Sequence, residues 1–247
     1  MKNRIGFVSF FFSLFTLVSL AQSSVSITSI AFPSRDALTI TADLYVAQND
    51  FPYVLLCHQD GFSRGEYKTI VDKINKLGFN CIAIDQRSGN DVNGITNETA
   101  DRARVKKLPV EPLDAEQDIV AAIDYTFGIS NKKVIVVGSM YSASLALKIA
   151  AYNTKVKAVA AFSAGDNCGE KLKLNKAVET LNKPVFITCS GTEATATKEL
   201  ITHIPSKNIV SFFPDSEGNQ GAKALWKKEP ESKKYWRAFK KFLLSVK

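Results

Sequence analysis

Short runs of apolar residues alternate with amphipathic segments along most of the chain, and this alternation constrains the fold more than any other sequence feature. The runs are continuous, as is typical of strands that are buried on both faces of a sheet. They occupy residues 53–57, 81–84, 134–137, 156–162, 185–188 and 209–213. Helical patterns between them occupy residues 67–77, 119–127 and 141–151. The alternation predicts an α/β protein with a mostly parallel sheet and helices on both faces.

The N-terminal segment has the pattern of a secretory signal peptide. Lys2 and Arg4 precede an apolar run over residues 5–20, and small residues lead to Ala21. We therefore expect residues 1–21 to be removed on export, which predicts a periplasmic or secreted protein. No later stretch is apolar over about 20 residues, so we expect no integral membrane segment after cleavage.

Residues 22–247 are expected to form one domain, because no repeat or linker divides them. Two strands are predicted at its start, over residues 25–31 and 38–47, on either side of a turn. Residues 86–112 form the one long irregular stretch. A stretch of that length is typically functional or covers a pocket.

The basic character of the protein is concentrated at one end. The formal net charge is +8, and residues 221–247 alone contain nine Lys or Arg against two Glu. Apolar residues recur there at helical spacing, from Tyr235 to Val246, which predicts an amphipathic helix with lysines on its outer face. We interpret this face as a solvated surface and expect no nucleic-acid partner.

Residues 134–144 carry the strongest functional signal. A predicted strand ends at Gly138-Ser139, Met140 follows, and the helical segment begins at Tyr141-Ser142. A strand that turns sharply into a helix, with small residues two before and two after the tip, is typical of a nucleophile elbow.

With this elbow, the chain resembles the α/β-hydrolase fold, in its small lidless branch related to dienelactone hydrolases and exported bacterial esterases. The resemblance extends over the whole mature chain and includes the segments 57–61, 63–67, 78–87, 134–144 and 218–226. It implies an eight-stranded, mostly parallel sheet with flanking helices and no large cap domain. It also implies a catalytic triad in the order nucleophile, acid, histidine.

The resemblance places Met140 at the nucleophile position and Gln220 at the histidine position. A thioether has no proton to lose, and a carboxamide does not titrate near neutrality, so neither residue can perform the triad's chemistry. Glu193 matches the acid position, although it could equally be a surface glutamate. Reading Ser139 or Ser142 as the tip fits less well, because large residues would then stand where the turn needs small ones.

The same resemblance predicts an oxyanion hole formed by the backbone N–H groups of Tyr141 and Gln59. His58 lies in the same loop as Gln59, and we expect its ring to hold that loop. His203, the other histidine, is expected at a helix end.

The cysteines indicate no metal or cofactor site. Cys57 and Cys81 lie in predicted core strands, and no pair has the spacing of zinc ligands. Cys168 and Cys189 lie near the pocket rim, where either a disulfide or two free thiols is compatible with export.

These features favour a catalytically inactive homologue that binds a ligand or acts as a scaffold. The expected ligand is a small molecule with a carbonyl or carboxylate group. The alternative is an active ester or acyl hydrolase that uses Ser139 or Ser142 with His58. The sequence leaves the oligomeric state open.

Overall fold

The computed structural model describes residues 25–169 and 171–247. The predicted signal peptide, residues 1–21, lies outside this part of the chain and stays a prediction. Within the described ranges, no helix is long and apolar enough to cross a membrane.

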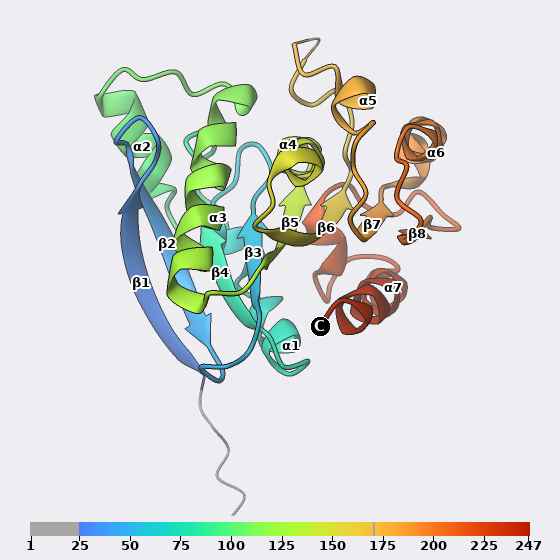
Figure 1. The fold of residues 1–247 in the computed structure, drawn as a ribbon, viewed down its shortest axis with the longest axis horizontal. Coiled ribbons are helices and arrows are strands. Elements are labelled where there is room, and N and C mark those ends of the chain that lie inside the picture. The colour runs from blue at the N-terminus through green and yellow to red at the C-terminus, as the bar shows by residue number, and fades with distance from the viewer. Residues whose placement is uncertain (1–24, 170) are drawn as a thin grey trace, which may run out of the picture.

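The described residues build one eight-stranded sheet, with strand order β1-β2-β4-β3-β5-β6-β7-β8 (Figure 1). Strands β1, β2 and β4 pair antiparallel, and the pairs from β4–β3 to β7–β8 are parallel. The bounds are β1 Ser26–Pro33, β2 Thr39–Val46, β3 Tyr53–Cys57, β4 Asn80–Ile84, β5 Val134–Ser139, β6 Val156–Phe162, β7 Val185–Thr188 and β8 Ile209–Phe212. This confirms the predicted mostly parallel, eight-stranded sheet.

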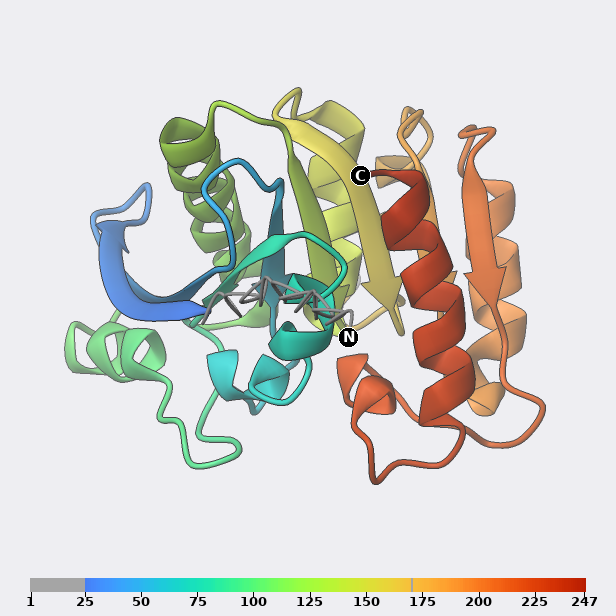
Figure 2. The same ribbon diagram turned by 90° about the horizontal axis from the view of Figure 1, so that it is seen from below.

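Helices cover both faces of the sheet, as Figure 2 shows from below. Helices α1 and α7 pack on one face, and α3, α4 and α6 pack on the other. The bounds are α1 Val71–Asn75, α2 Glu98–Val105, α3 Glu116–Ser130, α4 Tyr141–Tyr152, α5 Leu174–Ala177, α6 Ala194–Thr202 and α7 Ser232–Ser245. Within residues 25–169 and 171–247, no separate cap domain is inserted between these elements.

Strand β5 shows why the central runs are apolar throughout. Ile135 and Val137 pack on the side of α1 and α7, whereas Val134 and Val136 pack on the side of α3 and α4. Alternate residues of a strand point to opposite faces, so a strand covered on both sides has no exposed position. The carboxyl ends of β3, β5, β6 and β7 therefore lie together at one edge, where the loops can meet.

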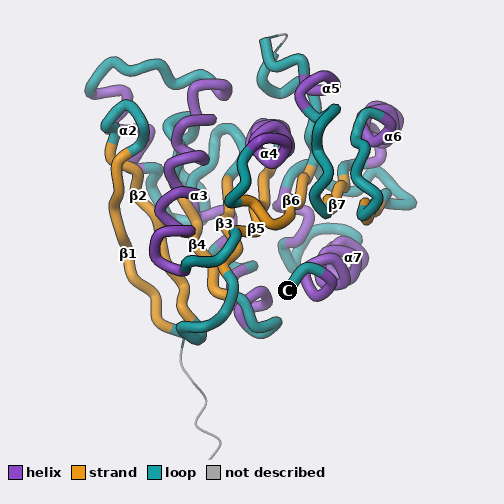
Figure 3. The backbone as a smooth tube through the Cα atoms, in the orientation of Figure 1, coloured by secondary structure: helices purple, strands orange, loops and turns teal. Residues whose placement is uncertain are grey.

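The stretch 86–112, expected to be irregular, contains helix α2 (Figure 3). The helix begins after Asn97, whose side chain accepts a hydrogen bond from Ala100 N at 2.8 Å. It buries only Thr99, Ala100 and Ala103. Such small residues produce no apolar periodicity, which explains why the sequence pattern missed the helix.

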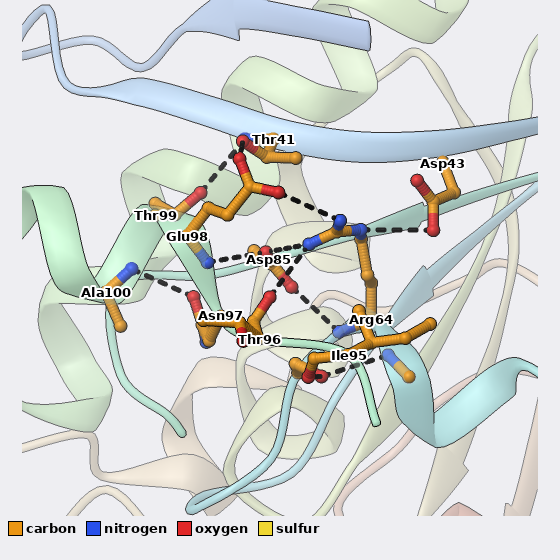
Figure 4. A network of polar contacts seen from close by, with 12 residues as sticks. Thr41, Asp43, Arg64, Asp85, Ile95, Thr96, Asn97, Glu98, Thr99 and Ala100 are labelled. Carbon is orange, nitrogen blue, oxygen red and sulfur yellow. Dashed lines mark hydrogen bonds and ion pairs between the residues drawn. The ribbon is translucent and has the colours of Figure 1, made fainter. Parts of the chain in front are cut away.

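Arg64 ties this helix to the sheet (Figure 4). Its guanidinium donates to Thr96 O at 3.0 Å and to Glu98 Oε1 at 3.1 Å, and it also pairs with Asp85. Burial raises the pKa of Asp85 to about 6, against the opposing effect of Arg64. The N-terminal end of α2 is thus anchored beside β2 and β4.

Candidate functional site

The predicted elbow is present at the end of β5. Met140 stands between β5 and α4 with φ 54° and ψ −117°. This conformation is strained for a residue with a side chain, at a cost of about 1–3 kcal/mol. A Cβ on Gly138 would lie 2.3 Å from Ser142 O, so the turn requires glycine there. Met140 is therefore the tip residue of a sharp strand–turn–helix.

Gln220 and Glu193 meet at the carboxyl ends of β6 and β7. The Gln220 amide donates to Glu193 Oε1 at 3.2 Å. The other carboxylate oxygen accepts from Ser163 Oγ at 2.8 Å and from Ser190 N at 2.9 Å. The carboxylate thus holds the Gln220 amide, but the amide has no proton to exchange at neutral pH.

The neighbouring Gly221 brings this pair close to the elbow. A Cβ on Gly221 would lie 3.3 Å from Met140 Cγ and 2.6 Å from Ser139 Oγ. The loop that carries Gln220 therefore passes directly against the tip of the turn. Met140, Gln220 and Glu193, which are far apart in the sequence, belong to one site.

The prediction that the Gln59 N–H lines an oxyanion hole is wrong. That N–H donates to Glu66 Oε2 at 2.9 Å, so it is already paired inside the protein. The N–H groups of Asp60, one residue later, and of Tyr141 have no hydrogen-bond acceptor within the described residues. The Gln59 N–H is therefore occupied, whereas the N–H groups of Asp60 and Tyr141 are not.

Glu66, which the sequence did not single out, lies buried beneath this site. Its Oε1 accepts a hydrogen bond from Ser139 Oγ at 2.8 Å, and its backbone oxygen accepts from Trp226 Nε1 at 2.8 Å. Burial raises the pKa of this carboxyl to about 7, although hydrogen bonds from Gln59 and Ser139 oppose the shift. Glu66 thus joins the loop after β3 to the elbow strand.

We expect Glu66→Gln to remove a pH dependence of stability. The folded pKa of about 7 lies above the ordinary value of 4.5, so the folded state binds the proton more tightly. Stability contributed by this group should therefore be present below pH 4.5 and decline as the pH rises to about 7. Relative to Glu66→Gln, the wild type should lose about 3 kcal/mol between these limits, measured by urea unfolding.

The exposed-site variant Glu199→Gln is the matched control, since it should follow the wild type at every pH. Other buried titrating groups are present in both Glu66 forms, so their contributions cancel in the difference. Parallel stability curves for the wild type and Glu66→Gln would show that Glu66 titrates normally.

His58 has the structural role that we expected. Its ring is buried, and Nδ1 lies 2.8 Å from Gln59 O while Nε2 accepts from Gln86 N at 2.9 Å. These contacts require the neutral ring, and burial lowers the pKa of His58 to about 4. The ring thus holds the loop after β3 and has no nitrogen free for proton transfer.

The alternative Ser–His constellation is not assembled. Ser142 Oγ donates to the backbone oxygen of His58 at 2.5 Å, whereas Ser139 Oγ donates to Glu66. Both serines are fully buried, so neither hydroxyl can reach a substrate. His203 forms the C-terminal cap of α6, as predicted.

All four cysteines are free thiols, so Cys168 and Cys189 form no disulfide. Cys168 Sγ lies 3.7 Å from Tyr141 O, at the first turn of α4. Burial raises the pKa of the Cys168 thiol to about 11, which leaves it unreactive at neutral pH. In the described part of the chain, no three His, Cys, Asp or Glu side chains group to hold a metal ion.

Cys168 also lines an open cavity of about 730 Å³ beside the start of α4. One wall comes from the end of the 86–112 stretch and from the turn that follows it, and the other comes from the loop after β6. The lining residues are Pro109, Glu111, Pro112, Leu113, Asp114, Asn167, Cys168, Gly169 and Lys171. The cavity is large enough for a small organic molecule.

The comparisons with known proteins agree with the observed fold. The family model described as "Dienelactone hydrolase family" matches residues 42–209. No curated protein matches the sequence.

Several solved structures share the fold. A Pyrococcus furiosus esterase has a TM-score of 0.67 at 14% identity over 90% of this chain and 93% of its own. A dienelactone hydrolase from Anabaena variabilis has a TM-score of 0.65 at 16% identity over 90% and 96%. A cold-adapted esterase from an Arctic intertidal metagenomic library has a TM-score of 0.63 at 15% identity over 92% and 96%. At these identities the likeness establishes the fold alone.

Proposed function

Because the chain belongs to the dienelactone hydrolase family, we propose that it is a non-catalytic member that binds a small carbonyl-bearing ligand. The contact between Gln220 and Glu193 carries the proposal. A hydrolase of this fold needs a side chain there that takes a proton from the nucleophile and returns it to the leaving group. The Gln220 amide donates a hydrogen bond to the Glu193 carboxylate at 3.2 Å, and an amide cannot take part in such a proton transfer.

The elbow tip lacks the other half of the chemistry. Met140 is held in the strained conformation that presents a side chain above the sheet, yet a thioether does not attack a carbonyl carbon usefully. The nucleophile and the proton-transferring base of one reaction are therefore both missing, at positions that lie next to each other in the structure. A single missing group could be replaced by a neighbour, but the buried Ser139, Ser142 and His58 offer no substitute.

Backbone donors support the binding half of the proposal. The unpaired N–H groups of Asp60 and Tyr141 suit one oxygen acceptor, since oriented amides are how this fold holds a carbonyl oxygen. The Glu193 carboxylate lies at this site and disfavours a second negative charge. We therefore favour a neutral carbonyl group over a carboxylate, with the cavity beside α4 as room for the rest of the ligand.

We expect the purified protein not to hydrolyse p-nitrophenyl acetate or butyrate above the rate of a heat-denatured sample. It should also not be labelled by a fluorophosphonate probe, because no serine hydroxyl is both exposed and activated at the elbow. Spectrophotometric release of p-nitrophenol and in-gel fluorescence measure the two outcomes.

An active esterase of the same fold serves as the positive control for both assays. Turnover that disappears on replacing a pocket residue, such as Glu193→Gln or Met140→Ala, would contradict the proposal. Turnover that survives in both variants would arise outside this pocket. The residue that the fluorophosphonate probe labels would then identify its source.

A further inference from the structure

The outer face of α7 is a stripe of cations that the fold does not use. Lys233, Arg237, Lys240 and Lys241 are exposed on it, together with Leu244, which is 47% exposed. Steps of three, four, seven and eight residues place side chains on one side of a helix. We call these five residues the α7 stripe. The opposite side of the helix is buried against the sheet through Tyr235, Phe239, Phe242 and Leu243.

None of the stripe's cations forms an ion pair within the described residues. The adjacent Lys234 provides the contrast, because it pairs with Asp215 at 2.8 Å and with Glu231 at 2.6 Å. Side chains four apart on a helix are neighbours, so Lys233, Arg237 and Lys241 repel one another. Lys233 in the first turn of α7 opposes the helix dipole, and that turn contains no acidic residue, so the N-cap Glu231 is the one acid at this helix end. The clustering of cations on one face therefore lowers the stability of α7. A contribution to helix stability cannot explain why the cations are there.

Helix α1 extends the basic surface beside α7, on the same face of the sheet (Figure 2). Lys73 Nζ lies 5.1 Å from the ring centroid of Trp236, which joins the two helices at the surface. Lys76, the C-cap residue of α1, is exposed, and Asp72 is the single acid of this short helix. The cations therefore spread over two adjacent helices and form a broad surface.

We propose that the α7 stripe docks the protein on an anionic phospholipid surface. Unpaired lysines and arginines near a membrane are attracted by the negative potential of acidic headgroups. Leu244 lies among them with nearly half its surface exposed, and a bilayer interface accepts an apolar side chain between headgroups. A phosphate polymer in water offers Leu244 no such environment. This proposal is independent of the pocket, because the stripe lies on α7 and the pocket lies at the strand ends.

Flotation with lipid vesicles tests the proposal. We expect the protein to bind vesicles of 70% phosphatidylcholine and 30% phosphatidylglycerol at about 50 mM salt, and to be released at about 500 mM. Reversing the stripe with Lys233→Glu, Arg237→Glu, Lys240→Glu and Lys241→Glu should lower the partition coefficient by at least about 100-fold. Circular dichroism and a melting curve should show an intact fold, because the substituted side chains are exposed and the packed face of α7 is unchanged.

The control reverses the same amount of charge elsewhere, with Lys106→Glu, Lys171→Glu, Lys176→Glu and Lys207→Glu. All variants keep the same N-terminus, so its apolar segment cannot account for a difference between them. Equal loss of binding in this control would show that overall charge alone is responsible, and would overturn the proposal.

Leu244→Gln distinguishes a lipid surface from other polyanions. It should weaken vesicle binding several-fold while leaving binding to heparin and duplex DNA unchanged. If heparin or DNA binds more tightly than vesicles, and Leu244→Gln has no effect on vesicles, the surface recognises a polyanion and the lipid assignment is wrong. Absence of vesicle binding by the unchanged protein at low salt would also overturn it.

Discussion

The double variant Met140→Ser with Gln220→His should hydrolyse p-nitrophenyl acetate at least about 100-fold faster than the unchanged protein. The elbow already holds its tip residue at φ 54° and ψ −117°, which presents a serine hydroxyl above the sheet. A histidine at 220 would reach Glu193 as the amide does now, over 3.2 Å, and the carboxylate would orient its ring. The N–H groups of Asp60 and Tyr141 would then stabilise the developing oxyanion. Initial rates with purified protein measure the gain.

The single variants are the controls for this gain. Met140→Ser lacks a base, and Gln220→His lacks a nucleophile, so each should remain near the unchanged protein because the two groups act as a unit. The variant Met140→Ser with Gln220→Asn keeps an amide at position 220 and should also be inert. A folded double variant without activity would contradict the placement of Gln220 at the histidine position.

Glu193→Gln on the restored background tests the acid. If Glu193 orients the new histidine, its replacement should lower kcat by about 100-fold, back to the rate of the unchanged protein, while leaving KM little changed. An unchanged kcat would show that Glu193 only anchors the surrounding loop through Ser163 and Ser190.

The sequence predicted the elements that bury continuous apolar runs. Strand β3 begins and ends where the pattern placed it, at Tyr53 and Cys57, because both faces of that strand are covered. The elbow was predictable because its requirements are local: Gly138 must be glycine, and the residue two positions after the tip must also be small. The position of Gln220 in the site was predicted from the resemblance of its segment to a family motif. No physical signal in the sequence itself indicated that position.

The missed features depend on contacts between residues that are distant in the sequence. Glu66 receives a hydrogen bond from Ser139 of a different strand, and nothing in its own neighbourhood marks it as buried. The same carboxylate accepts a hydrogen bond from the Gln59 N–H, which removes the predicted oxyanion donor. Helix α2 was missed because its ion pairs with Arg64 and its small buried residues leave no periodic pattern.

Arg87→Met should lower the free energy of unfolding by about 3–5 kcal/mol. The Arg87 side chain is fully buried and pairs with Asp118 at 2.7 Å and with Asp36 at 2.7 Å. Asp118 is equally buried, so removing the guanidinium leaves its carboxylate without a counter-charge in the interior. Urea unfolding measures the loss. Arg104→Met, which removes an exposed ion pair with Asp101, should cost at most about 1 kcal/mol.

Removing both charges should cost less than the sum of the two single losses. In Arg87→Met with Asp118→Leu, no unpaired buried charge remains, and apolar side chains replace the ion pair. The double variant does not regain the full stability of the unchanged protein. Ser34 Oγ and the backbone N–H of residue 87 both donate to Asp118, and both lose their acceptor. We therefore expect the double variant to be about 2 kcal/mol more stable than additivity predicts. Strict additivity would mean that the two side chains stabilise the fold independently, and that the pair does not act through its charge.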